Sequence, residues 1–162
     1  HVPMIPVAHG GSATAYKATV ANAHASPLGN ENFAVMNIPG QDTFVWMQNA
    51  EPISLFCADE TDGESLRACE QVTQSLLGYE TAGTAVEPVL AESYSANADL
   101  TEWTFKLRKD VKFHNGFTLD AADVVASLVL QWDAASPLHK GNTGGFSYWS
   151  GLFGSFLNAP AQ

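Results

Sequence analysis

The spacing of hydrophobic and polar residues changes between residues 99 and 132, from a period of two to the period of a helix. From Thr101 to Leu107 apolar and polar residues alternate, which predicts a strand with one buried face. Lys109-Asp110 interrupts this alternation, and Val111 and Phe113 then resume it. The pattern therefore predicts a β-hairpin whose second arm lies directly after the interruption.

A helix is expected to follow this hairpin. Asn115-Gly116 has the composition of a turn, and Thr118 is placed to cap the helix. Asp120 and Asp123 fall in the first turns, where carboxylates favour the positive end of the helix dipole. The apolar positions of the helix are Val124, Val125, Leu128 and Trp132. Together the hairpin and the helix predict a core that contains Phe105, Leu107, Val111, Phe113, Val124 and Leu128.

A second amphipathic helix is predicted between Thr61 and Gly78. Thr61 and Glu64 have the spacing of a capping box, and Gly78 is placed to end the helix. The apolar stripe of this helix comprises Leu66, Cys69, Val72 or Thr73, Leu76 and Leu77. Further along the chain, Leu90-Ala91-Glu92 predicts a short turn or helix that packs on the hairpin.

Three extended segments are expected before the helix that is predicted between Thr61 and Gly78. Residues 2–8 are apolar and contain two prolines, which predicts an edge strand or a connector. Residues 33–38 and 44–48 each predict a short strand. The strand at 44–48 is expected to end at Glu51-Pro52, because proline cannot continue a central ladder.

The composition limits the kinds of partner that the chain can bind. Its 162 residues suffice for one domain, and seventeen Asp and Glu against seven Lys and Arg give a formal net charge of −10. Such a chain repels phosphate backbones and anionic membrane surfaces, so we expect no nucleic-acid binding. No apolar run is long enough to span a membrane. The sequence begins without Met and without a basic leader, so we expect a longer parent protein.

No motif of the sequence indicates a catalytic or metal centre. The acidic run at 59–64 fails the EF-hand register, because Gly63 falls one position too early when counted from Asp59. The five histidines share no ligand spacing, and neither a nucleophile elbow nor a phosphate loop is present. We therefore expect no enzyme and no cofactor. Aromatic residues and glycines interleave from 146 to 156, a composition that fits either a ligand cleft or a core.

The segment FKLRKDVKFHNGFTLDAADVVAS carries a specific resemblance. Its matching residues are Phe105, Leu107, Arg108, Val111, Phe113, His114, Gly116, Ala121, Asp123 and Val124. In this order they resemble the signature of the family 5 extracellular solute-binding proteins, the peptide, dipeptide and nickel receptors of ABC importers. The upstream segment EPVLAES extends the resemblance, which covers residues 44 to 150.

The first forty residues resemble a different part of the same receptors. Residues 1–40 contain a proline-bearing strand and a P-L-x-x-x-x-F element, which resemble the C-terminal tail of the receptor lobe. Residues 41–162 resemble the N-terminal part of that lobe, so the order here is tail first and head second. Either a permuted family branch or an engineered fusion would explain this order. Because both ends contribute to one lobe in the family, we expect the two segments to form one domain.

The resemblance implies an α/β fold, namely part of the larger lobe of a class II periplasmic-binding-protein fold, with a small mixed sheet and two main helices. It implies a binding component of an ABC importer, with an oligopeptide or another small solute and a membrane permease as partners. The implied location is extracellular or periplasmic, with a membrane anchor on the longer parent. Because the second lobe is absent, a homodimer through uncovered lobe surface is also expected.

The resemblance also gives candidate residues. In an exported protein Cys57 and Cys69 are expected to form a disulfide, and two buried thiols are the alternative. Tyr148 and Trp149 are the leading ligand-facing candidates, followed by Glu51 and then His9. Two other function classes remain open: an interaction module that completes a partner receptor chain, and a hydrolase, for which the sequence offers no nucleophile–base pair.

Overall fold

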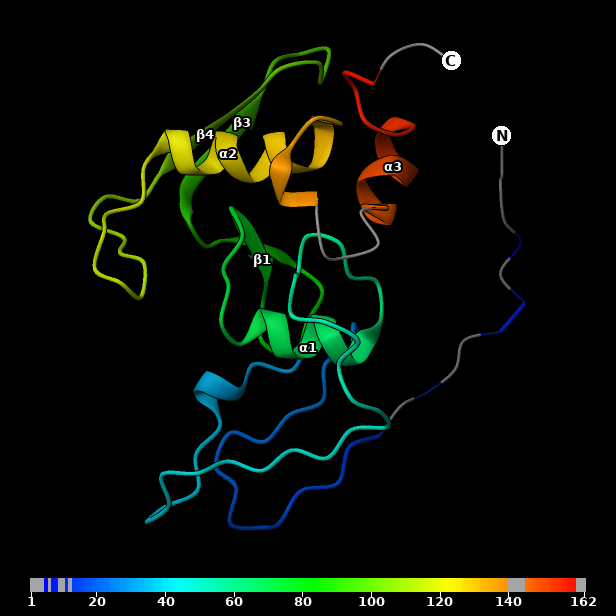
Figure 1. The fold of residues 1–162 in the computed structure, drawn as a ribbon. Helices are drawn as coiled ribbons and strands as arrows, with labels where there is room; N and C mark the ends of the chain where they lie inside the picture. Colours follow the sequence, from blue (N-terminus) through cyan, green and yellow to red (C-terminus); the bar gives the residue numbers. More distant parts are fainter. Residues whose placement is uncertain (1–4, 6, 9–10, 12, 140–144, 160–162) are drawn as a thin grey trace.

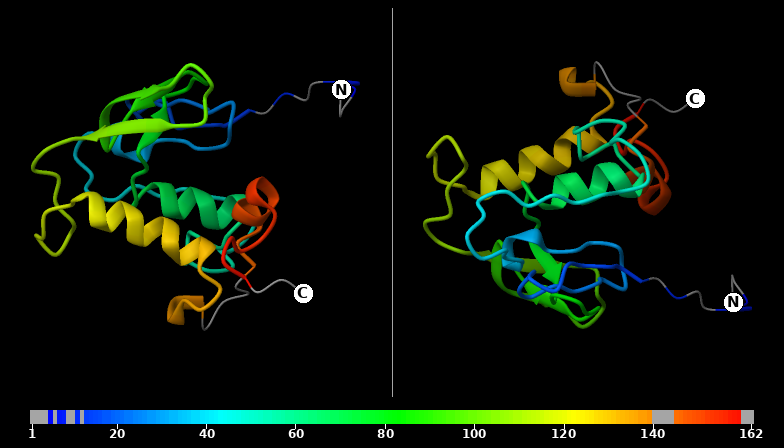
Figure 2. Two further views of the ribbon diagram at one scale, coloured as in Figure 1. Left: turned by 90° about the horizontal axis from the view of Figure 1, so that it is seen from above. Right: turned by 90° about the horizontal axis from the view of Figure 1, so that it is seen from below.

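The structure is a computed structural model that describes residues 5, 7, 8, 11, 13–139 and 145–159. Figure 1 and Figure 2 show α1 and α2 in one layer, with β3, β4 and the N-terminal segment in the other. No helix of the described ranges is long and apolar enough to cross a membrane. The elements are η1 (Phe33–Val35), α1 (Gly63–Glu70), β1 (Leu77–Tyr79), β2 (Val86–Pro88), β3 (Ala91–Ala96), β4 (Trp103–Leu107), α2 (Ala121–Trp132), η2 (Pro137–His139) and α3 (Ser147–Phe153).

The strand predicted before Leu107 is confirmed as β4, but the predicted hairpin is wrong. β4 pairs antiparallel with β3, and the register runs from Ala91↔Leu107 to Ala96↔Trp103. Residues 111–118 instead fold back on themselves, because the N–H of Phe113 donates to the carbonyl of Phe117 at 2.9 Å. β3 is the better partner for β4 because it offers an aromatic face: the Tyr94 ring stacks 6.3 Å from that of Trp103.

The same pairing overturns the turn or helix predicted at Leu90-Ala91-Glu92. Ala91 opens β3 and is completely buried, and a bulge follows it between Ala91 and Ser93. Glu92 lies at this bulge and forms an exposed ion pair with Lys106 of the neighbouring strand, at 2.5 Å. The segment AESYSA lacks a clear apolar alternation, so its strand character depends on the partner strand.

The turn at Asn115-Gly116 and the helix after it are confirmed, whereas the predicted cap is displaced. Gly116 has φ +90° and donates its N–H to the carbonyl of Phe113 at 2.8 Å. The N-cap of α2 is Asp120, not Thr118. Its side chain accepts from the N–H groups of Ala122 and Asp123, and the Asp123 carboxylate accepts from the N–H of Asp120, which completes a capping box.

The second predicted helix is present as α1 but is shorter. Its N-cap is Asp62, one residue after the predicted Thr61, and it ends at Glu70. Thr73 closes this end, because its N–H and its hydroxyl both donate to the carbonyl of Cys69, at 2.9 and 2.8 Å. Gly78 does not stop the helix; it lies in β1, which pairs with β2.

Neither of the short strands predicted before α1 forms a ladder. Residues 33–35 form the 3-10 turn η1, and an isolated bridge joins Ala21 to Asn37. Residues 44–48 are extended and alternate between half-buried and exposed side chains, but they pair with no strand among the described residues.

The α/β fold class is confirmed, and the strands are divided between two separate two-stranded antiparallel sheets. The buried apolar residues in the described part of the chain are Met36, Cys69, Ala91 and Phe146. The predicted core is wrong in detail: Phe113 and Leu128 remain 42% and 45% exposed, and α2 has no buried residue. Nothing in the described residues covers the outer side of α2, so its apolar positions remain half exposed.

Candidate functional site

An open hollow of about 670 Å³ lies beside α1, η1 and the extended segment that ends at Glu51. Glu51 is exposed and lines this hollow, at the end of the segment where the sequence placed a ligand-facing carboxylate. The lining residues are Phe33, Trp46, Met47, Gln48, Asn49, Ala50, Glu51, Arg67 and Ala68. They come from three segments that are distant in sequence, so the hollow depends on how the N-terminal segment docks on α1.

Arg67 of α1 organises the floor of the hollow. Its Nε donates to Oε2 of Glu31 at 3.0 Å, and its Nη2 donates to the carbonyl of Gly29 at 3.1 Å. The guanidinium also lies 5.6 Å from the centre of the Trp46 ring, within reach of a cation–π interaction. Glu31 neutralises Arg67, so Arg67 is not available to pair with Glu51. Among the described residues, the Glu51 carboxylate, which lines the hollow, therefore has no ion-pair partner.

Aromatic rings form one wall of the hollow. The ring of Trp46 lies 4.9 Å from that of Phe33 and 5.8 Å from that of Tyr16. Nε1 of Trp46 is buried and has no acceptor among the described residues. The wall therefore presents apolar ring faces to the hollow, while the Trp46 N–H points into the protein.

Burial and hydrogen bonding act in opposite directions on Glu31. Burial raises the pKa of its carboxyl, but hydrogen bonds from the Arg67 side chain and from the backbone N–H groups of Glu31 and Ser26, with the Arg67 charge, outweigh burial. The pKa therefore lies below its usual value, and Glu31 is ionised at neutral pH. The neighbouring Glu70 shows the opposite result, because burial raises its pKa more than Arg67 lowers it.

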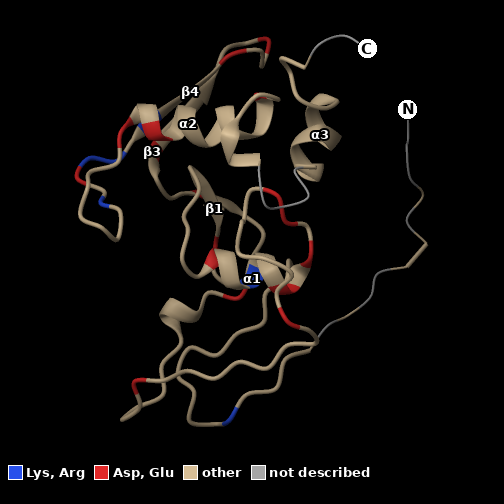
Figure 3. Cartoon of the chain, viewed as in Figure 1, with Lys and Arg blue, Asp and Glu red and all other residues tan. Residues whose placement is uncertain are grey.

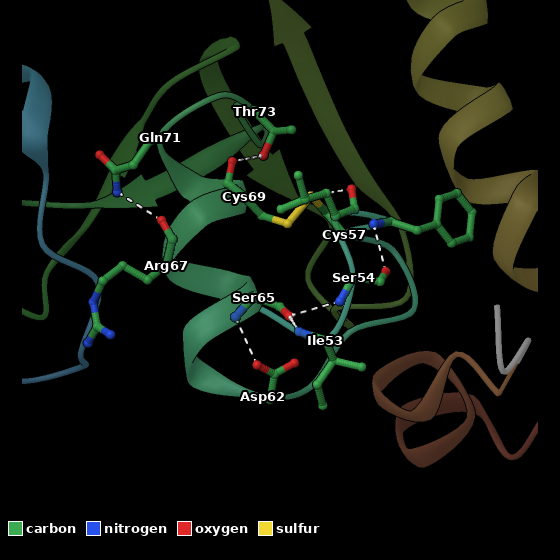
Figure 4. The surroundings of a disulfide bond; sticks show 11 residues. Ile53, Ser54, Cys57, Asp62, Ser65, Arg67, Cys69, Gln71 and Thr73 are labelled. Carbon is green, nitrogen blue, oxygen red and sulfur yellow. Dashed lines mark hydrogen bonds between the residues drawn. A yellow bond between two sulfur atoms is a disulfide. The ribbon is translucent and has the colours of Figure 1, made fainter. Parts of the chain in front are cut away.

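The disulfide expected between Cys57 and Cys69 is confirmed, with an S–S distance of 2.08 Å. It closes a loop against α1, and Figure 4 shows the polar contacts beside it. The hydroxyl of Ser65, which is completely buried, accepts from the N–H of Ile53 at 2.9 Å. The N–H of Ser65 donates to Oδ1 of the N-cap Asp62 at 2.8 Å. The loop after Glu51 is thus fixed to α1 by the disulfide and by the hydrogen bonds of the Ile53 and Ser54 N–H groups to the Ser65 hydroxyl.

The same loop holds the start of α3. Oδ1 of Asp59 accepts from the N–H of Phe146 at 2.6 Å, across 87 residues of sequence. Phe146 is 1% exposed, and its ring contacts those of Phe56, His139 and Phe156 at 6.1, 5.0 and 6.0 Å. Phe146, the first of the interleaved aromatics, therefore belongs to the core.

Tyr148 and Trp149 lie on α3, away from the hollow. Tyr148 is 59% exposed, whereas Trp149 is half-buried with its ring 4.4 Å from that of Phe153. Nε1 of Trp149 is buried without an acceptor among the described residues. Figure 1 shows α3 and η1 on opposite sides of α1, so the structure does not join Glu51 to the α3 aromatics in one site. His9 lies outside the described residues.

The sequence did not single out the residues that form the floor and the wall of the hollow. Arg67 was detectable only as a scarce cation, and Glu31 lies 36 residues before it in a loop. Figure 3 shows several basic residues in the loop after β4, further ones on α1 and the N-terminal segment, and carboxylates spread over the whole chain. The described ranges contain no group of three or more His, Cys, Asp and Glu that could hold a metal ion.

Comparison with known proteins connects the chain to one family. Residues 85–148 match the family described as bacterial extracellular solute-binding proteins, family 5 Middle. The chain is 35% identical to the heme-binding protein A of Haemophilus influenzae over 118 residues, which is 68% of this chain and 22% of that protein. It is 36% identical to the dipeptide-binding protein of Escherichia coli over 83 residues, which is 48% of this chain and 16% of that protein.

A solved structure gives the same result. The ABC transporter-associated periplasmic binding protein DppA from Helicobacter pylori, in complex with the peptide STSA, superposes with a TM-score of 0.58 and 30% identity. The match covers 64% of this chain and 21% of that protein, so the chain spans about a fifth of the length of these relatives. The family consists of binding proteins rather than enzymes, and its description places it outside the cell. The chain therefore belongs to the bacterial extracellular solute-binding proteins of family 5.

Proposed function

We propose that this chain forms part of the larger lobe of the solute-binding component of an ABC importer, and that its solute is an oligopeptide. The observation that carries the proposal is the match of residues 85–148 to the family, together with a peptide-bound structural neighbour. The protein works by binding without chemistry: two lobes close around the solute, and the membrane permease engages the closed form. It operates in the periplasm or outside the cell, held at the membrane by a longer parent.

In this proposal Glu51 contacts the solute within the hollow. Tyr148 and Trp149 are separate candidates on α3, which lies away from the hollow. His9 is a further candidate on the N-terminal segment. The unpaired carboxylate of Glu51 suits the amino group or a basic side chain of a peptide, and the Trp46 ring suits its apolar parts. A heme or nickel ligand is less well supported, because no histidine of the described residues lines the hollow.

The proposal also treats residues 1–40 and 41–162 as one domain. Its support is a set of contacts between the two segments. Besides the Glu31–Arg67 ion pair, the Gln71 side chain accepts from the N–H of Phe33 at 3.0 Å and donates to the carbonyl of Glu31 at 2.9 Å. These contacts fix the N-terminal segment to α1 on the side that carries the hollow.

The test is an NMR titration of the chain with the peptide Ser-Thr-Ser-Ala. We expect an affinity on the order of 1 mM or weaker, because one part of a lobe cannot enclose a peptide. The shifts should centre on residues 46–51. Shifts on α3 instead would favour Tyr148 and Trp149 as the contact residues. Glu51→Gln should weaken binding, and Glu87→Gln, at an exposed site on β2, should not. Micromolar binding of the peptide would refute the claim that the chain is only part of a lobe. Shifts confined to other residues would refute the proposed binding site. Tight binding of hemin would favour a heme carrier over a peptide receptor.

A further inference from the structure

The turn at Asn115-Gly116 has a chemistry that solute binding does not use. Asn115 is the one asparagine of the sequence that is followed by glycine. In such a pair the backbone nitrogen of the glycine can attack the carbonyl carbon of the asparagine side chain, because no Cβ hinders its approach. Asparagine is accordingly among the thermolabile residues of proteins. Whether the reaction occurs in a folded chain depends on how the structure holds the two residues.

The structure leaves this turn open to ring closure. Figure 1 and Figure 2 show the loop between β4 and α2 projecting from the rest of the chain, and a Cβ at Gly116 would meet nothing within 4 Å. The exposed side chain of Asn115 is folded back beside the nitrogen of Gly116, because Oδ1 accepts from the N–H of Phe117 at 3.1 Å. This hydrogen bond also polarises the carbonyl that is attacked. Nδ2, the leaving nitrogen, donates to no described residue.

One hydrogen bond opposes the reaction. The N–H of Gly116 donates to the carbonyl of Phe113 at 2.8 Å, and this nitrogen must lose its proton before it can attack. Both residues are exposed, and the loop is closed by a bond from the N–H of Phe113 to the carbonyl of Phe117. Exposed loops of this kind open locally at low cost, so the nitrogen becomes free without unfolding of the rest of the chain.

The pair Asp62-Gly63 has the same glycine, but the structure protects it. The N–H of Ser65 donates to Oδ1 of Asp62 at 2.8 Å and holds the pKa of that carboxyl below its usual value. The group is therefore an ionised carboxylate, which a nitrogen nucleophile does not attack. Gly63 is also the first residue of α1, so ring closure would have to break the helix cap. The structure thus distinguishes two pairs that are alike in sequence.

We propose that Asn115 is a modification site, at which the chain deamidates through a succinimide formed with Gly116. The nitrogen of Gly116 bonds to Cγ of Asn115 and the bond from Cγ to Nδ2 breaks, so that Nδ2 leaves as ammonia with the proton of the Gly116 nitrogen. Water then adds to either carbonyl of the ring and opens it, which gives aspartate or isoaspartate. One water enters and one ammonia leaves, so no oxidant or other reactant is needed.

The two products differ in their effect on the loop between β4 and α2. Aspartate adds a negative charge but keeps the normal main chain. Isoaspartate inserts a methylene into the main chain, inside the loop that the Phe113–Phe117 hydrogen bond and the bridge between Lys112 and Thr118 close. Isoaspartate should therefore open this loop. It should leave α2 helical, because the cap at Asp120 lies beyond the bridge.

The inference does not depend on the solute, and its test uses the full chain without a ligand. The chain is incubated at mildly alkaline pH, and peptide mapping by mass spectrometry follows the replacement of side-chain amides by carboxyls. We expect Asn115 to react about tenfold faster than any other asparagine, because glycine follows it alone. The chain unfolded in urea provides the reference rate, and the folded rate should lie within about tenfold of it. Asn115→Gln should abolish the reaction at this position.

Two results would overturn the proposal. One is a folded chain that protects Asn115 more strongly than this, and the other is a folded chain in which Asp62 isomerises as fast as Asn115 reacts. The effect on the loop is measured by amide hydrogen exchange on the separated products. The isoaspartate product should lose protection at Phe113 and Leu119, whose N–H groups are bonded within the loop, whereas Asn115→Asp should retain it. Equal protection in both would refute the effect on the loop.

Discussion

The ion pair between Glu31 and Arg67 provides the sharpest test of how the N-terminal segment is attached. The pair joins the first forty residues to α1, and its side chains are only 5% and 19% exposed. Glu31→Gln preserves the shape of the side chain but leaves Arg67 without its counterion. Removing one partner of a buried pair typically costs about 3 to 5 kcal/mol. Arg67 keeps its bond to the carbonyl of Gly29 and some contact with solvent, so we expect a loss of about 3 kcal/mol.

The measurement is a double-mutant cycle in urea, followed by circular dichroism, with Glu31→Gln, Arg67→Met and the double variant. If the pair is coupled as in the structure, the double variant loses less stability than the sum of the single variants. Glu92→Gln is the matched control, because it removes an exposed ion pair that has a shorter N–O distance, 2.5 Å against 3.0 Å. Burial rather than distance decides the effect, so the control should change stability little.

The same pair predicts a dependence on pH. The folded chain holds the pKa of Glu31 below the usual 4.5, so the carboxylate stabilises the fold above that pH. This contribution is lost as the pH falls through the lower folded value, and Glu31→Gln should flatten that part of the stability curve. If Glu31→Gln leaves stability and its pH dependence unchanged, the N-terminal segment is not attached through this pair and the single-domain proposal loses its main support.

Three further substitutions test local features. Replacing Cys57 and Cys69 by Ser should cost about 3 kcal/mol in urea unfolding by the chain-entropy estimate, and an unchanged midpoint on adding reductant to the wild type would contradict this. Gly116→Ala should destabilise the chain by about 1 kcal/mol, because Gly116 has φ +90°. Gly151→Ala should instead stabilise it by about 0.5 to 1 kcal/mol, because Gly151 lies in α3 with open space around it. Equal shifts in the thermal midpoint of the two variants would refute this backbone argument. Asp120→Ala should cost about 1 kcal/mol and reduce the helical signal, unless another residue caps α2.

Features governed by near neighbours in sequence could be predicted from the residues alone. The alternation before Leu107, the turn at Gly116 and the helical spacing after Asp120 all appear in the structure at or near the expected positions. The pairing of β4 could not be predicted, because β3 has few apolar residues and its strand character depends on partner residues 7 to 16 positions away. The early end of α1 likewise depends on the pairing of Leu77 with Pro88, which competes with the helix.

The candidate site was predictable only where it lies at the end of an element. Glu51 follows directly from the prediction that proline ends the preceding extended segment, and it does line the hollow. Arg67 and Trp46 meet there because Glu31 reaches α1 across 36 residues, and no spacing in the sequence encodes that contact. Tertiary contacts between distant segments therefore determine the site, and local patterns determine the elements that carry it.

The described part of the chain relies on buried polar contacts to join its segments. Four apolar residues are buried, but each of three buried polar side chains connects parts that are distant in sequence. Glu31 binds Arg67, Ser65 binds the backbone of Ile53, and Asp59 binds the backbone of Phe146. Directional contacts such as these fix a geometry but supply little of the driving force that apolar burial gives. If the chain is part of a receptor lobe, as proposed, we expect this combination: specific polar contacts between segments, and a small apolar core because the rest of the receptor covers the remaining apolar surface.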